Sequence, residues 1–337
     1  MTAHNAAEVS GGRSGLFPRG QRTPALSGLL LLDKQPCFTS FESLKLIKRA
    51  FSSRKAGHTG TLDKFASGLL LVLVGRAVKL SPWFLNCDKR YEGTVYFGAE
   101  TDTLDPEGAV IAEAAPPSRE SLEQALPGFR GNLLQAPPAY SAVHVGGERA
   151  HRLARSGRVP EMERRPISVY ALDLLSYDPP LARIRVHCSK GTYIRSLTRD
   201  IALAAGSRGH LRELRRTWIA GFSVEDALNP GTGPETLDET RKAAVRAALR
   251  PLDAGIFQAL GIPCLRVDAK TARDMGRGGA LAGLLKPEET ESIGGSAAVF
   301  DPEGRLAAVV ERRENGFRYG FVNLPETGSS GGNDAAY

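Results

Sequence analysis

The sequence predicts an α+β fold around a mixed, mainly antiparallel sheet, followed by a small β-rich C-terminal module. Two segments, Lys89–Phe97 and Ala182–Ser189, alternate apolar and polar residues as half-buried strands do. Turn signals at Pro179-Pro180 and Gly146-Gly147 join neighbouring strand-like segments in the manner of hairpins. Segments with helical spacing lie between these hairpins, and this mixture indicates the α+β class.

The composition is that of a globular protein. The chain has 337 residues, of which 42% are apolar and 24% charged. This length can bury a sizeable core and allows two domains. No apolar run approaches the roughly 20 residues that a membrane helix needs, and no stretch has the character of a secretory signal. We therefore expect no membrane partner.

The charge balance and the cysteines restrict the functional classes further. A net charge of +7 and a pI near 9.3 favour a polyanionic partner without identifying it. The cysteines lie far apart without paired spacing, which argues against a zinc site and against a disulfide framework. They are Cys37, Cys87, Cys188 and Cys264. We expect reduced thiols, a cytoplasmic location and no metal or other cofactor.

The first elements are expected near residue 29. Residues 1–26 are rich in Gly, Ser, Ala and Arg without periodicity and predict a disordered tail. The apolar run Leu29–Leu32 then predicts a core strand. Thr39 and Glu42 form a candidate capping box for a helix over Ser40–Phe51. Its apolar stripe is expected at Phe41, Leu44, Ile47 and Phe51.

The remaining elements up to residue 260 follow from the same two periodicities. A Gly/Thr-rich loop at 57–63 precedes an apolar strand at Leu69–Val74. Further along the chain, in order, we expect a strand at 89–97, a helix at 118–126, an extended segment at 133–145 broken by Pro137-Pro138, a helix at 149–156, strands at 167–177 and 182–189, a helix at 193–205, a strand at 210–218 and a helix within 229–259.

The C-terminal part is predicted to be a separate domain. We place the boundary at Gly261-Ile262-Pro263, so that residues 27–260 form the larger domain and residues 261–326 the smaller one. The smaller domain should contain a helix at 268–277 and strands at 297–300, 305–312 and 317–324. Residues 327–337 are expected to form a second disordered tail.

The loop Gly57–Asp63 is the first candidate site. Its glycines allow a tight bend, and its threonines can hydrogen-bond nearby main chain, so it could hold the Asp63 carboxylate still. From the residues alone, an aspartate in such a loop is more often a turn-former than a catalytic group. With its flanks at 56–63, 66–70 and 75–77, however, the loop resembles the nucleophile motif of the bacterial tRNA pseudouridine synthase B family.

Four further motifs extend this resemblance from about Leu29 to Phe222. They are Asp88–Gly93, Gln135–Val143 with Gly147 and Arg149-Ala150, Gly191–Leu197 and Leu211–Thr217. By residue chemistry alone, Tyr91 reads as a core ring, Arg195 as a solvated helix residue, and the arginines of the last motif as phosphate contacts or water-facing groups. The chain departs from the family pattern at Lys64-Phe65, where Pro-Leu is usual, and at Gln35, Cys37 and His144.

The resemblance implies an isomerase that converts a uridine of tRNA, at position 55 in the T arm, to pseudouridine. It makes Asp63 the nucleophile or base, Arg195 its ion-pair partner and Tyr91 the ring that stacks on the base, all three counted as catalytic. A guanidinium beside a carboxylate favours the charged form and orients it. Expected substrate contacts are His58, which could instead brace its own loop, together with Tyr193, Leu214, Lys34, Thr61 and Arg149.

The tRNA is the expected partner over a wider surface as well. A flipped-out uridine would occupy the site. Phosphate contacts are expected from Lys45, Lys48, Arg49, Arg54 and Lys55. By position, the C-terminal domain resembles the PUA-like RNA-binding domain of the family and would reach the acceptor stem, and we expect a monomer. A non-catalytic tRNA binder or folding helper that uses the same cleft is the alternative, and it predicts that Asp63 is dispensable.

Overall fold

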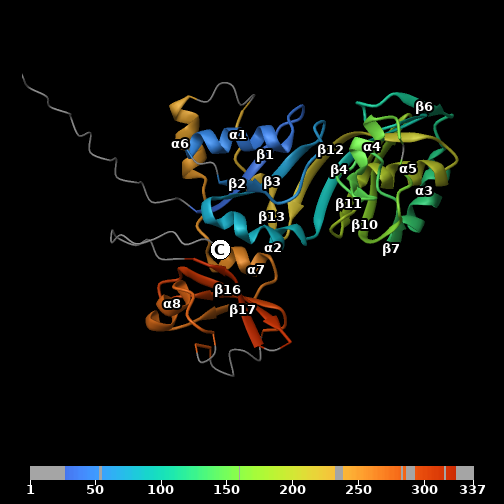
Figure 1. The fold of residues 1–337 in the computed structure, drawn as a ribbon. Coiled ribbons are helices and arrows are strands. Elements are labelled where there is room, and N and C mark those ends of the chain that lie inside the picture. The colour runs from blue at the N-terminus through green and yellow to red at the C-terminus, as the bar shows by residue number, and fades with distance from the viewer. Residues whose placement is uncertain are drawn as a thin grey trace, which may run out of the picture.

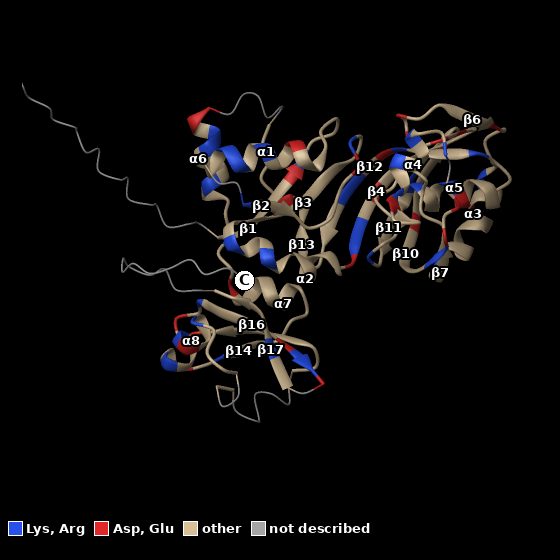
Figure 2. Cartoon of the chain, in the orientation of Figure 1, with Lys and Arg blue, Asp and Glu red and all other residues tan. Residues whose placement is uncertain are grey.

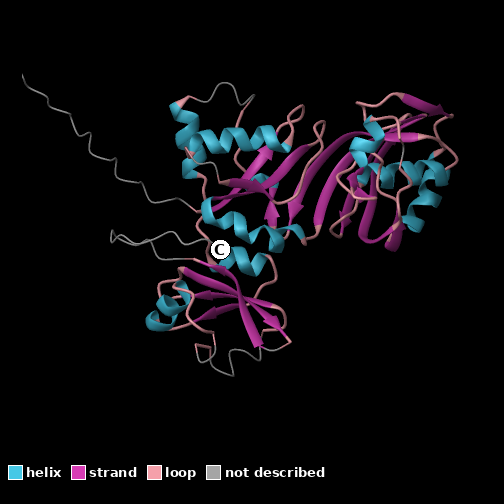
Figure 3. Cartoon of the chain, viewed as in Figure 1, coloured by secondary structure: helices cyan, strands magenta, loops and turns pink. Residues whose placement is uncertain are grey.

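The computed structural model describes residues 27–52, 55–158, 160–231, 238–281, 284–285, 293–314 and 316–323. The tails expected at 1–26 and 327–337 therefore lie outside the described residues, as does Arg54. Figure 1 shows a long curved sheet with helices on its faces and a smaller β-rich module packed below one end. Figure 3 shows the same elements coloured by type.

The large sheet orders its strands differently from the chain. Its path is β1 (Gly28–Lys34), β3 (Ser67–Val74), β12 (Gly209–Ile219), β4 (Lys89–Phe97), β11 (Leu181–Cys188), β10 (Arg165–Asp178) and β7 (Gly131–Gln135). Two short strands, β2 (Ala56–His58) and β13 (Phe222–Ser223), pair with β3 and β12. All these pairs are antiparallel except β12 with β3. The predicted α+β class with a mixed, mainly antiparallel sheet is confirmed.

Helices cover both faces of the sheet at β1 and β3 and one face farther along. Helices α1 (Ser40–Ala50) and α6 (Glu239–Ala247) pack on one face of β1 and β3. Farther along the sheet, α5 (Ile194–Ala204) packs on β4 and β12. The opposite face of β1 and β3 is covered by α2 (Ser81–Leu85) and α7 (Ala254–Ala259). Because both faces are buried, β1 and β3 read as continuous apolar runs.

Shorter elements complete the larger part of the chain. They are the 3₁₀ turns η1 (Gly75–Leu80), η2 (Leu126–Phe129) and η3 (Val224–Asp226), the helices α3 (Arg119–Ala125) and α4 (Ala150–Arg155), the hairpin of β5 (Ala99–Thr101) with β6 (Val110–Glu113), and the hairpin of β8 (His144–Val145) with β9 (Glu148–Arg149). The last hairpin turns at Gly146-Gly147, as predicted.

Three expectations need correction. Residues 229–259 contain two helices, α6 and α7, because Asp238 and Asp253 each cap a separate helix. Strand β7 ends at Gln135, before the two prolines, which cannot donate to a ladder. Phe41 was expected in the apolar stripe of α1 but is 60% exposed, since Ser40 takes the buried position one residue earlier. The capping box of Thr39 and Glu42 is present.

The C-terminal module consists of β14 (Cys264–Arg266), β15 (Ser296–Phe300), β16 (Leu306–Arg313), β17 (Gly316–Val322) and α8 (Ala269–Gly276). The short strand β14 was not predicted; it lies parallel to β15. Trp83 Nε1 donates to Ser296 Oγ at 3.1 Å, and Phe257 stacks edge-on against Phe300. The module thus shares one apolar core with α2 and α7. Its PUA-like character and the exact domain boundary stay predictions.

Gly68 provides a test of the parallel contact between β3 and β12. It has a φ of +104°, and a Cβ there would collide with the carbonyl oxygen and amide nitrogen of Arg216. We expect Gly68→Ala to lower the free energy of unfolding by about 3 kcal/mol or more, measured by urea denaturation. Gly131→Ala is the matched control, because Gly131 also has positive φ but open space where a Cβ would stand. Equal losses in the two variants would contradict the close contact.

Candidate active site

The loop that carries Asp63 is tied to its surroundings mainly through its backbone. Thr59 N–H donates to Leu71 O at 3.0 Å, and Ala66 N–H donates to Asp63 O at 3.2 Å. Ser40 Oγ accepts from Leu62 N at 2.9 Å and donates to Leu62 O at 3.1 Å. The first turn of α1 therefore holds the residue just before Asp63. The Asp63 side chain remains 36% exposed.

Arg195 binds the Asp63 carboxylate through both oxygens. Its Nε donates to Oδ2 and its Nη2 donates to Oδ1, each at 3.0 Å. The guanidinium is buried and also donates to Thr103 O at 2.7 Å and Tyr140 O at 3.1 Å. These main-chain contacts fix the orientation of the guanidinium group. The structure thus brings together the two side chains that the sequence predicted to pair.

Asp105 is a second carboxylate against the same guanidinium, and sequence reasoning missed it. Its Oδ2 lies 3.3 Å from Arg195 Nη1. Its Oδ1 accepts from Thr103 Oγ1 at 2.6 Å and from Glu107 N at 3.0 Å. In the sequence Asp105 begins the signal Asp-Pro-Glu-Gly, which indicates a turn and nothing more. Only the fold places this turn beside α5.

Lys34 supports the other side of the loop. Its side chain is fully buried, and its Nζ donates to the carbonyls of Phe38 at 2.6 Å, Gln35 at 3.0 Å and Lys64 at 3.4 Å. Burial lowers the pKa of Lys34 to about 8, although the charge of Asp63 opposes this shift. Lys64 stands where the family has proline, and here its carbonyl is held by Lys34. The loop is therefore fixed on this side without the proline ring.

Arg216 lies beneath the loop, contrary to expectation. The arginines of its motif were expected to bind phosphate or face water. Arg216 is instead 2% exposed and donates to Gly60 O at 3.1 Å, within the loop, and to Leu69 O at 2.7 Å, after it. Arg215 points to the opposite sheet face and pairs with Asp33 at 2.9 Å. Strand alternation, which puts Arg216 on the face of Leu214, was the signal that could have found this.

The expected base-pocket residues surround this centre. Tyr91 and Leu214 are buried and share one apolar cluster with Leu62. Burial raises the pKa of the Tyr91 hydroxyl, and the nearby Arg216 charge opposes the rise. Tyr193 precedes α5 and is held by Gln135, which accepts from Tyr193 N at 2.8 Å and donates to its carbonyl at 3.1 Å. Burial also raises the pKa of Tyr193.

His58, Thr61 and Arg149 are less directly connected. His58 is half-buried at the end of β2, where burial and the Arg216 charge lower its pKa, so the neutral ring is favoured. Thr61 is exposed, and Arg149 is exposed with its Nη1 donating to Ala142 O at 2.6 Å. Within the described residues, none of the three hydrogen-bonds Asp63. Their contacts with RNA stay predictions.

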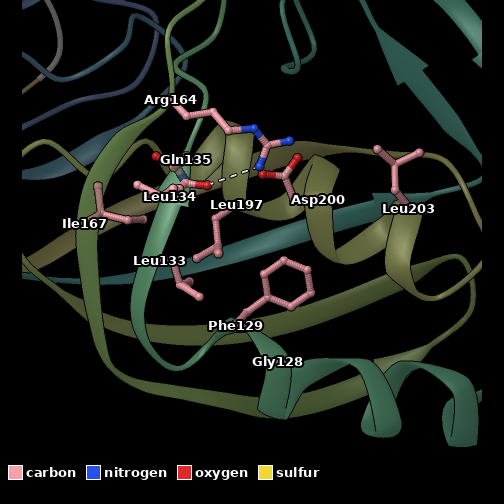
Figure 4. Close-up of a pocket in the computed structure, with 10 residues that line it drawn as sticks. All are labelled: Gly128, Phe129, Leu133, Leu134, Gln135, Arg164, Ile167, Leu197, Asp200 and Leu203. Atoms are coloured by element: carbon pink, nitrogen blue, oxygen red, sulfur yellow. Dashed lines mark hydrogen bonds between the residues drawn. The ribbon is translucent and has the colours of Figure 1, made fainter.

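A pocket of ≈ 280 Å³ lies between α5, β7 and η2 and is lined by both polar and apolar side chains. Figure 4 shows Leu197 and Asp200 of α5 facing Phe129 and Leu133 across it, with Arg164 bonded to the main chain of β7 at its rim. Gln135 belongs both to its wall and to the contact with Tyr193. Asp63 does not line this pocket, so we do not assign it to the chemistry.

The wider surface carries charges of both signs. Figure 2 marks Lys and Arg positions on α1, on α6 and along the middle of the large sheet, with Asp and Glu positions among them. Over the part of the chain that is described, no group of three or more His, Cys, Asp or Glu side chains could hold a metal ion. No helix in the same residues has the length and apolar character needed to cross a membrane.

Comparison with known proteins identifies the family. Residues 48–194 match the model of the TruB family pseudouridylate synthase N-terminal domain. A tRNA pseudouridine synthase B of Caulobacter vibrioides is 37% identical over 304 residues, which cover 88% of this chain and 95% of that protein. The chain belongs to the TruB family. A tRNA pseudouridine synthase B of Borreliella burgdorferi (strain ZS7) is 43% identical over 204 residues, covering 60% of this TruB-family chain and 72% of that protein.

Solved structures agree with the fold of this TruB-family chain. A Cbf5-Nop10-Gar1 complex contains a chain that superposes with a TM-score of 0.61 at 24% identity, over 89% of this chain and 84% of that one. An archaeal box H/ACA sRNP Nop10-Cbf5 complex gives 0.60 at 22% identity, over 88% and 86%. At this level of identity the likeness supports the architecture alone. It covers the C-terminal module as well as the large sheet, since nearly nine-tenths of the chain is included.

The buried Lys34 predicts a pH dependence of stability. Its folded pKa is about 8 against an ordinary 10.5, so the unfolded chain binds the proton more tightly. The free energy of unfolding contributed by this group therefore rises as the pH increases from about 8 towards 10.5.

We expect the stability difference between wild type and Lys34→Met to shift in favour of wild type between about pH 7.5 and 9.5, measured by urea unfolding. Lys79→Met, at an exposed lysine, controls for the lost charge, and a shift in the opposite direction would contradict the burial.

Proposed function

We propose that this chain converts uridine to pseudouridine in tRNA, at position 55 of the T arm, with Asp63 as the essential nucleophile or base. Family membership and relatives named tRNA pseudouridine synthase B support an isomerase that acts on tRNA. The observation that carries the assignment of Asp63 is its geometry. It is a partly exposed carboxylate whose two oxygens are both held by a buried guanidinium.

The reaction needs a positioned carboxylate and no redox chemistry. The N1–C1′ bond of the uridine breaks, the uracil turns, C5 bonds to C1′, the hydrogen on C5 leaves as a proton, and N1 takes up a proton. Each carboxylate oxygen that accepts one hydrogen bond keeps a further lone pair. Asp63 can therefore remain paired with Arg195 and still act at the sugar, either as nucleophile or as base. Arg195 acts by orienting the carboxylate in one plane.

The uridine must leave the RNA stack to reach Asp63. We assign Tyr91, Tyr193 and Leu214 to the base pocket and His58, Thr61 and Arg149 to the surrounding RNA. Lys34 uses its three N–H donors on carbonyl oxygens, so we assign it to support of the loop instead of a substrate contact. Contact of the C-terminal module with the acceptor stem, a monomeric state and a cytoplasmic location complete the proposal.

Asp63→Asn tests the nucleophile. We expect kcat for release of tritium from a tRNA transcript labelled at uridine C5 to fall by about 10³-fold or more, because an amide can neither attack nor accept the proton. Binding to the same tRNA should stay within a few-fold of wild type. Asp173→Asn, at an exposed carboxylate of β10, is the isosteric control and should release tritium normally. Near-normal turnover by Asp63→Asn would favour the non-catalytic binder instead.

Arg195→Lys tests orientation separately from charge. Lysine keeps the positive charge but cannot bind both carboxylate oxygens in a fork. We expect kcat to fall about 10²-fold while KM for tRNA changes little, since the lost interaction positions a reacting group. Far-ultraviolet circular dichroism and thermal unfolding would establish that the variant is folded. Unchanged kcat in a folded variant would remove Arg195 from the mechanism.

A further inference from the structure

Phe41 is exposed without a structural need. It lies in the first turn of α1 and is 60% exposed, more than any other Phe, Tyr or Trp side chain among the described residues. The helix packs through Ser40, Leu44, Leu46, Ile47 and Ala50. A phenylalanine left in water forgoes roughly 1.5–3 kcal/mol of burial, so the fold itself gains nothing from this ring. The ring is available to a binding partner.

Two lysines accompany the ring. Lys45 Nζ and Lys48 Nζ each lie 5.7 Å from the centre of the Phe41 ring. Their spacing of four and seven residues puts all three side chains on one face of α1. The nearest carboxylate along the helix, Glu42, is turned back to Thr39, whose N–H and Oγ1 both lie 2.8 Å from it. The face therefore presents an apolar ring flanked by positive charge.

The ring belongs to the first turn of the helix that contacts the Asp63 loop. Ser40, its neighbour, is bonded to both backbone groups of Leu62, and Leu62 precedes Asp63. Phe41 directly follows Ser40 in the chain, and Asp63 directly follows Leu62. The start of α1, which carries Phe41, therefore adjoins the loop of Asp63. The exposed ring of Tyr170, by contrast, belongs to β10 and contacts Asp88 and His187, away from the Asp63 loop.

We propose that Phe41, Lys45 and Lys48 form a platform for an unpaired nucleobase of the tRNA, next to the uridine that is modified. This rests on the proposed function and deepens it. Flipping a base leaves its former neighbours with an unstacked face, and an aromatic side chain can cover such a face for any base. The two ammonium groups are placed for the phosphates on either side of that base. The platform contributes to binding and not to the chemical step.

The first experiment compares substitutions at the ring. We expect Phe41→Ala to raise both Kd and KM for the tRNA by roughly 10-fold, the size of one stacking contact, with kcat at saturating tRNA unchanged. Phe41→Trp should bind at least as tightly as wild type. Tyr170→Ala removes an aromatic ring of similar exposure from a distant strand and should change neither constant. Wild-type Kd and KM in Phe41→Ala would overturn the proposal.

Salt dependence separates the ring from the lysines. Lys45→Ala and Lys48→Ala should each reduce the slope of log Kd against log salt by about 0.7–0.9, because each loses one phosphate contact. Phe41→Ala should weaken binding at every salt concentration without changing the slope. A slope that changes in Phe41→Ala but not in the lysine variants would overturn the assignment of roles.

Fluorescence tests for stacking itself. The Trp introduced by Phe41→Trp should be quenched when tRNA is added, relative to wild type, whereas a Trp introduced by Tyr170→Trp should not. Absence of quenching in a Phe41→Trp variant that binds tRNA would overturn the platform. Failure of the proposed function is a different result. In that case wild type would release no tritium from the labelled tRNA, while the comparison of Kd values would still decide whether Phe41 contacts the RNA.

Discussion

The ion pair between Asp63 and Arg195 is the interaction on which the geometry of the candidate site depends. Its partners are 132 residues apart in the chain and meet through two hydrogen bonds. A buried guanidinium is costly unless its donors are satisfied, and here a second carboxylate and two main-chain carbonyls complete the set. The loop after β2, the turn at 102–108 and the start of α5 must therefore all be in place before Asp63 has one orientation.

Two further cations hold the loop from below through its main chain. Lys34 and Arg216 together bind carbonyls at Gly60, Lys64 and Leu69, so they bracket Asp63 on both sides. This arrangement depends on backbone positions and therefore tolerates a change of side chain. It explains how the chain accommodates Lys64-Phe65 where the family has Pro-Leu. The charges of Lys34 and Arg216 favour an anionic ligand, and burial together with the Arg216 charge lowers the pKa of His58, which favours its neutral ring.

The residues proposed for chemistry and those proposed for RNA binding differ in how firmly the fold holds them. The side chains that we propose for catalysis are buried or half-buried, and Arg195 fixes the Asp63 carboxylate through two hydrogen bonds, as a pre-organised group requires. Phe41 and Lys45 are exposed and Lys48 is half-buried, so these side chains can change conformation against RNA. The C-terminal module is joined to the larger domain by a shared apolar core and by the Trp83 contact. It therefore presents its own surface at a defined angle to the site.

The sequence by itself predicted most of the helices and strands, and its resemblance to a family singled out Asp63 as the central carboxylate. Strand β4, the capping box of α1 and the hairpin at Gly146-Gly147 depend on local periodicity and turn chemistry, which one stretch of chain contains in full. The tertiary structure alone decided that Asp105 meets Arg195, that Arg216 lies under the loop and that Phe41 faces solvent. Local patterns specify the face of an element on which a residue lies. They do not specify what covers that face, because this depends on strands and helices that are distant in the sequence.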